Sequence, residues 1–202
     1  MRARRVGEHS LLVECAGAAE VAATYAVLTS RADDLGATDV VPAARTVLID
    51  GVSDVPAALE RLVSLHADAA AELQPDGPVV ELPTRYDGED LAEVARQWDV
   101  GTAEVVRLHQ EATFHVQFCG FAPGFAYCTG LPDGLTVARR ADPRPRVPAG
   151  SVALAGEYTA VYPSASPGGW QLIGTTRAEL WRPGADVPAL LAPGTRVRFV
   201  DG

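Results

Sequence analysis

Three segments in the second half of the chain combine glycine, proline and aromatic residues in a way that suits a ligand pocket. Proline and glycine hold backbone angles that other residues avoid, and glycine lets a ligand or another strand approach the main chain closely. Pockets built this way make many of their polar contacts through backbone N–H and C=O groups. Alternatively, the segments only form tight corners of a barrel. They are GFAPGFAY (120–127), RPRVPAGSVALAGEYT (144–159) and YPSASPGGWQLIG (162–174).

The first of these segments lies inside a longer stretch without any formally charged side chain, HVQFCGFAPGFAYCTGLP (115–132). Its length is too short, and its glycines and prolines too frequent, for insertion into a membrane. We interpret it as a strand that runs into a pocket-lining loop.

The side chains that most often supply nucleophiles are scarce or badly spaced. The chain has no lysine, which excludes a Walker-type phosphate lysine, a Schiff base and a lysine general base. Cys15, Cys119 and Cys128 show no C-x-x-C spacing and are expected to be reduced thiols. On one extended strand, His115 and Cys119 would share a face but lie roughly 13 Å apart, so the cysteines are expected to be buried apolar side chains. His109 and His115 do not have compact ligand spacing, and no metal site is predicted.

Composition indicates a globular protein with one large or two small domains. The chain has 202 residues, of which 48% are hydrophobic and 21% charged. The formal net charge of -9 disfavours nucleic acid and anionic lipid as partners. Near the N-terminus, only Leu11 to Val13 form an apolar run, which is too short for a signal-peptide core, so we expect a cytoplasmic protein.

Residues 1–86 predict an N-terminal α/β subdomain. Its first helix is expected to end near Gly36, and its second to be capped by Ser53. The order of strands and helices matches a split β-α-β, or ferredoxin-like, arrangement with two helices on one face of a four-stranded sheet. The expected strands are HSLLVE (9–14), TDVV (38–41), RTVLID (45–50) and PVVELP (78–83).

Residues 87–112 predict two short helices around Gly101, an arrangement that also occurs in DNA-binding helix-turn-helix motifs. The second helix carries Glu104 and Glu111 against the single Arg107, although a recognition helix must face phosphates. We therefore expect a packed helical linker between two domains.

From residue 113 to 202 the pattern is that of β-structure. Apolar and polar residues alternate over 113–118, 170–173 and 196–199, and glycine and proline interrupt the intervals between them. This favours a closed barrel or a sandwich with long functional loops. The overall fold class expected is α+β.

Three long motifs in this half resemble those of one known family. They are GFAPGFAYCTGLP (120–132), PRPRVPAGSVALAGEYTAVYP (143–163) and SPGGWQLIG (166–174). They are similar to the signature of the family that contains the B subunit of the bacterial ATP-dependent 5-oxoprolinase, also called allophanate hydrolase subunit 1 or the kinase inhibitor KipI. The resemblance implies an N-terminal α/β subdomain followed by a cyclophilin-like β-barrel.

The resemblance also implies a function that depends on other chains. The A, B and C subunits together would open the lactam of 5-oxo-L-proline to give L-glutamate at the expense of ATP, and this chain alone would be inactive. Because this chain has no lysine, ATP would be bound by partner surfaces, by arginine or by a non-Walker site. The alternatives are an inhibitor that binds a sensor histidine kinase, and a carboxyltransferase or allophanate-hydrolase-type module of urea metabolism.

Transferred position by position, the family motifs predict a pocket with three walls. Arg146 would clamp a carboxylate or phosphate, since a guanidinium offers two parallel donors, or would tie down a loop. Glu157 would be a general base if burial raised its pKa, although Tyr158 replaces the glutamine usual beside it. The first wall is Gly120, Phe121, Pro123, Gly124 and Phe125, the second is Arg146, Pro148, Gly150 and Ser151, and the third is Ser166, Pro167, Gly168, Gly169 and Trp170.

Overall fold

The protein consists of two compact units, Met1–Asp76 and Gly77–Gly202. The computed structural model describes the backbone of residues 2–69 and 77–202 and the side chains of 2–62 and 77–202. None of the helices in these ranges is long and apolar enough to cross a membrane.

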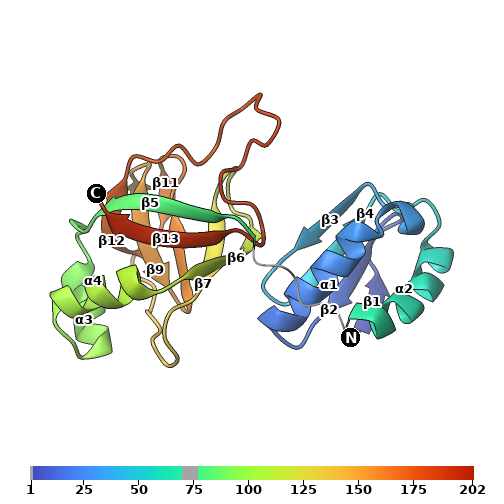
Figure 1. The fold of residues 1–202 in the computed structure, drawn as a ribbon, viewed down its shortest axis with the longest axis horizontal. Coiled ribbons are helices and arrows are strands. Elements are labelled where there is room, and N and C mark those ends of the chain that lie inside the picture. The colour runs from blue at the N-terminus through green and yellow to red at the C-terminus, as the bar shows by residue number, and fades with distance from the viewer. Residues whose placement is uncertain (1, 70–76) are drawn as a thin grey trace. The chain divides into compact units, whose positions relative to one another are not determined.

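The first unit is a four-stranded antiparallel sheet with two helices (Figure 1). The strand order is β1-β2-β4-β3, and β3 and β4, which correspond to two of the expected strands, pair antiparallel as a hairpin. Alternate residues of β2 and β4, such as Leu11 and Ile49, are fully buried and pack with Val21 and Leu28 of the first helix. The elements are β1 (Arg2–Arg5), β2 (Leu11–Glu14), α1 (Ala18–Ser30), η1 (Asp33–Leu35), β3 (Asp39–Pro42), β4 (Thr46–Asp50) and α2 (Val55–Ala69).

One strand predicted for this unit belongs elsewhere. The segment 78–83 was expected to close the N-terminal sheet, but it forms β5 (Val79–Arg85) of the barrel, where it pairs in parallel with β13. The sheet position beside β2 is taken by β1 instead. The ferredoxin-like arrangement is therefore not confirmed, and the unit boundary falls after Asp76 rather than after residue 86.

The second unit is a closed seven-stranded barrel, which confirms the expectation of a barrel in this half of the chain. The strand order around it is β10-β7-β6-β13-β5-β12-β9, and β8 and β11 pair as a separate two-stranded ribbon. Besides β5, the strands are β6 (Phe114–Cys119), β7 (Ala126–Thr129), β8 (Arg144–Val147), β9 (Ser151–Ala155), β10 (Tyr158–Val161), β11 (Ser166–Gly168), β12 (Gln171–Thr176) and β13 (Arg196–Asp201).

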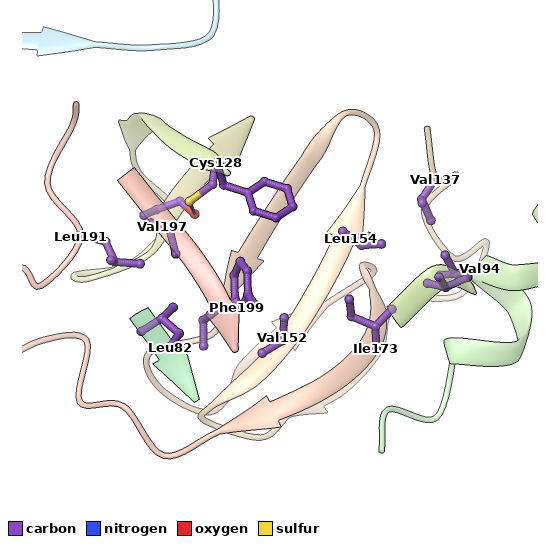
Figure 2. Close-up of a cluster of buried hydrophobic side chains, with 14 of the residues drawn as sticks. Leu82, Val94, Cys128, Val137, Val152, Leu154, Ile173, Leu191, Val197 and Phe199 are labelled. Atoms are coloured by element: carbon purple, nitrogen blue, oxygen red, sulfur yellow. Dashed lines mark hydrogen bonds between the residues drawn. The ribbon is translucent and has the colours of Figure 1, made fainter. Parts of the chain in front are cut away.

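The barrel interior is filled by apolar side chains from all parts of the unit (Figure 2). Leu82 of β5, Phe199 of β13 and Ile173 of β12 are at most 1% exposed. Burial of a side chain of this size contributes roughly 1.5–3 kcal/mol, so strands from distant parts of the sequence are held together mainly by this shared core.

Two helices belong to the barrel unit rather than linking two domains. They are α3 (Leu91–Trp98) and α4 (Thr102–Glu111), which lie against the barrel in Figure 1. Val94 and Trp98 of α3 are buried in the barrel core cluster, and the Trp98 indole donates a hydrogen bond to the Thr136 carbonyl at 3.0 Å. The linker predicted over 87–112 is therefore a packed part of the second unit, because its apolar face has a core to cover.

His109 of α4 is fully buried between two hydroxyl groups. Its Nδ1 lies 2.8 Å from the Tyr86 hydroxyl, and its Nε2 lies 2.9 Å from Thr159 Oγ1. Both ring nitrogens of His109 therefore have a hydroxyl partner, and the Thr159 hydroxyl also lies 3.4 Å from the Ala153 carbonyl oxygen. Burial lowers the pKa of His109 to about 3, so the ring is neutral at physiological pH.

Replacing His109 by glutamine should weaken the acid sensitivity of the fold. The unfolded chain protonates this histidine near its ordinary pKa of 6.5, but the folded chain does so only near 3. His109 therefore does not change the pH dependence of the free energy of unfolding above pH 6.5. Below pH 6.5, it lowers this free energy by up to about 1.4 kcal/mol for each unit that the pH falls. Urea unfolding of His109→Gln between pH 7 and 4 should show a shallower fall than the native chain. His115→Gln, at an exposed position, is the control, and a native-like slope in His109→Gln contradicts the account.

Candidate functional site

Several barrel strands are buried on both faces. In β9, Val152 and Leu154 point into the barrel core, whereas Ala153 and Ala155 belong to a second apolar cluster. Because successive side chains of a strand point to opposite faces, this second cluster lies on the outer surface of the barrel. The alanines leave room there for large rings.

Seven aromatic side chains form one continuous network that extends through this outer cluster. Phe118 stacks on Tyr127 with ring centroids 4.3 Å apart, and Phe125 meets Trp170 edge to face at 5.5 Å. Such offset and perpendicular arrangements are the favoured geometries of aromatic pairs. The members are Phe118, Phe121, Phe125, Tyr127, Tyr158, Tyr162 and Trp170.

A small pocket of about 100 Å³ opens within this network. Arg139 lies at its edge, with its guanidinium carbon 5.9 Å from the centre of the Trp170 ring. The pocket thus combines aromatic walls with one cation. It is lined by Phe121, Phe125, Tyr127, Arg139, Tyr162, Pro167, Gly168, Gly169 and Trp170.

Glycines allow the loops around the pocket to pack closely. Gly124 has a φ of +83°, and a Cβ there would lie 2.9 Å from the Trp181 Cβ. A Cβ on Gly168 would lie 2.3 Å from the Tyr162 hydroxyl oxygen. Both positions therefore require glycine, in agreement with the role proposed for glycine in these segments.

Phe121 lies at the mouth of the pocket in a strained conformation. It is a non-glycine residue with a φ of +69°, and its side chain is 62% exposed. Left-handed backbone is costly for a bulky residue, and such strain is concentrated at functional sites. Its ring contacts Phe125 and Tyr162 edge to face.

The structure brings together two of the three predicted walls. Gly120, Pro123 and Gly124 belong to the same loop as the lining residues of the first wall but do not line the pocket themselves, and Ser166 precedes the lining residues of the third. The predicted wall residues that line the pocket are Phe121, Phe125, Pro167, Gly168, Gly169 and Trp170.

The segment predicted as the second wall is the neighbour of the third. Strand β8 pairs with β11 through Val147 and Ser166. Arg146 is exposed on β8, Pro148 and Gly150 lie between β8 and β9, and Ser151 is the first residue of β9. None of the four lines the pocket. The arginine that does line it, Arg139, lies outside the three segments, so reasoning from the motifs missed it.

Glu157 is exposed in the two-residue turn between β9 and β10. Its carboxylate therefore lacks the burial that the prediction of a general base required. Burial of Tyr158 raises the pKa of its hydroxyl to about 12, and the negative charge of Glu157 adds to this rise.

The pocket tyrosines are protonated at neutral pH. Burial raises the pKa of Tyr127 and of Tyr162, and the nearby charge of Arg139 opposes the rise in both. Their hydroxyls are therefore suited to hydrogen bonding rather than to acting as bases.

A buried carboxylate ties the surroundings of the pocket together. Asp90, whose side chain is 6% exposed, accepts hydrogen bonds from Arg140 Nη1 at 3.1 Å and Arg144 Nη2 at 2.9 Å. Its other oxygen accepts from the Leu172 backbone N–H at 2.7 Å. Asp90 thereby connects the start of α3 to β8, to β12 and to the loop that carries Arg139. No local sequence pattern distinguishes it from an ordinary residue before a helix.

Comparison with known proteins assigns the family. A family model described as carboxyltransferase domain, subdomain C and D, matches residues 1–191. A protein of Escherichia coli O157:H7, named as the B subunit of 5-oxoprolinase, is 44% identical over 165 residues, which are 75% of this chain and 76% of that protein. The chain belongs to the family of 5-oxoprolinase B subunits. The family resemblance of the three motifs is confirmed.

Solved structures share the fold. The crystal structure of TTHA0988 is 37% identical with a TM-score of 0.77, covering 96% of this chain, and this chain spans only 40% of that one. Urea carboxylase of Kluyveromyces lactis is 19% identical with a TM-score of 0.74, over 99% of this chain and 21% of that one. At this low identity, the second likeness shows the fold alone.

Asp90 should matter far more to the fold than its neighbour Glu89. Both contact Arg144 Nη2, but the Glu89 side chain is 78% exposed and the Asp90 side chain 6%. Asp90→Ala leaves the largely buried Arg144 with the exposed Glu89 as its remaining ion-pair partner and removes the acceptor of the Leu172 N–H, and it should lower the free energy of unfolding by about 3 kcal/mol. Glu89→Ala, the matched control, should change it by less than about 1 kcal/mol. Equal effects in chemical denaturation would show that Asp90 does not anchor the site.

Proposed function

We propose that this chain is the B subunit of an ATP-dependent 5-oxoprolinase, which acts with the A and C subunits to hydrolyse 5-oxo-L-proline to L-glutamate. The observation that carries this proposal is the 44% identity, over three quarters of both chains, to a protein named as the B subunit of 5-oxoprolinase. The aromatic pocket gives the proposed complex a place on this chain for a small substrate.

The chemistry of the pocket supports a dependence on partners. Among the described residues that line it there is no cysteine, histidine or carboxylate, so these residues offer no nucleophile with an adjacent base. Its volume of about 100 Å³ is well below the roughly 300–1,000 Å³ of pockets that hold larger ligands, so a nucleotide does not fit. ATP would therefore be bound by partner chains or elsewhere on this one, and this chain would be inactive alone.

The thiols fit a reducing compartment. Cys15, Cys119 and Cys128 are free, and burial raises the pKa of each, which keeps them protonated and unreactive. We therefore place the complex in the cytoplasm.

Reconstitution tests the proposal. The purified chain, mixed with the cognate A and C subunits, 5-oxoproline and ATP, should release glutamate, and omission of any one chain should reduce the rate to background. Glutamate release is measured by an enzyme-coupled or chromatographic assay. Failure of every combination, with all three chains folded, would refute the proposal. Inhibition of a sensor histidine kinase by the same preparation would then favour the alternative function.

A further inference from the structure

We propose that this chain itself holds the substrate, a small cyclic amide that bears a carboxylate, in the aromatic pocket, with Arg139 as the partner of the carboxylate. The identity of the cyclic amide as 5-oxoproline rests on the proposed function. The location of the site and the role of Arg139 do not.

The size of the pocket limits the ligand to a few heavy atoms. Its volume of about 100 Å³ is well below the roughly 300–1,000 Å³ of pockets that enclose drug-sized ligands. The pocket therefore suits one small ring, with its substituent at the open side, and not a longer ligand.

The walls of the pocket are suited to a ring. Phe125, Tyr162 and Trp170 are each at most 5% exposed, and Phe125 meets the other two rings at 83° and 90°. Because perpendicular neighbours support each ring, the walls are preorganised and lose little freedom when a ligand enters. Aromatic faces are electron-rich and attract the weakly positive C–H groups of a saturated ring.

Arg139 supplies the charge that a carboxylate needs. Among the described residues that line the pocket it is the only charged one, so no acidic group there repels an anion. Arg140 and Arg144 are engaged by Asp90, whereas Arg139 is exposed and forms no hydrogen bond or ion pair with any residue in the described ranges. It lines the pocket together with Tyr127 and Tyr162.

The contact of Arg139 with Trp170 does not use up its hydrogen-bond donors. The guanidinium carbon lies over the Trp170 ring, 5.9 Å from its centroid, which is near the outer limit of a cation–π contact. A guanidinium carries five N–H donors and can donate two parallel hydrogen bonds to a carboxylate.

Three ligands distinguish the contribution of the lactam ring to the affinity from that of the carboxylate. Binding of 5-oxoproline, of 2-pyrrolidinone, which is the same lactam without the carboxylate, and of proline, which lacks the lactam carbonyl, is measured on the full chain by NMR titration. We expect 5-oxoproline to bind most tightly. Its affinity should fall with added salt, whereas the affinity of the uncharged lactam should not.

Substitutions of single arginines then test which of them binds the carboxylate of the ligand. Arg139→Gln should weaken the affinity for 5-oxoproline by at least about tenfold and change the affinity for 2-pyrrolidinone by less than about twofold. Arg146→Gln tests the other candidate clamp and should have little effect, as should the control Arg198→Gln, whose side chain is exposed on β13 and paired with Glu81. Thermal unfolding of each variant verifies that it is folded.

The outcomes distinguish this inference from the proposed function. If the full chain shows no saturable binding of 5-oxoproline while the reconstituted complex releases glutamate, the inference is overturned and the function stands. An affinity for 5-oxoproline that is unchanged in Arg139→Gln, or lost equally in Arg146→Gln, also overturns it. Binding with the expected pattern and without glutamate release by the complex supports the site and counts against the function.

Discussion

The site depends on one buried carboxylate. Asp90 accepts hydrogen bonds from two arginines and from the backbone of β12, and each of these donors lies in a different segment around the aromatic pocket. The cost of burying this charge is offset only because all of its partners are present together. The positions of the β8–β11 ribbon, the loop of Arg139 and the strand after Trp170 are therefore coupled to the start of helix α3.

The barrel separates stability from binding by using the two faces of the same strands. Inward side chains such as Val152 and Leu154 build the core, and outward alanines of the same strand make space for aromatic rings. The pocket is consequently formed on a rigid surface, although its mouth includes a strained residue, Phe121. Such a site can position a small ring accurately, because its walls are held by the packing of the barrel.

The sequence predicted those features that depend on neighbouring residues. Alternation around Phe114 and Val197 located barrel strands, and glycine at position 168 is required by close approach to Tyr162. The sequence predicted the strand at 78–83 but assigned it to the wrong sheet, because nothing within this segment shows that the partner of β5 is a strand more than a hundred residues later. It also missed Arg139 and Asp90, because their roles arise from folding distant segments together and no motif contains them. The clamp role predicted for Arg146 stays a prediction.

The most direct measurement is a crystal structure of the chain, in complex with its partner subunits, soaked with 5-oxoproline. The account predicts electron density for the lactam ring among Phe125, Tyr162 and Trp170, with the carboxylate within hydrogen-bonding distance of the Arg139 guanidinium. Density for the ligand at another place in the complex, with the aromatic pocket filled only by solvent, would contradict it.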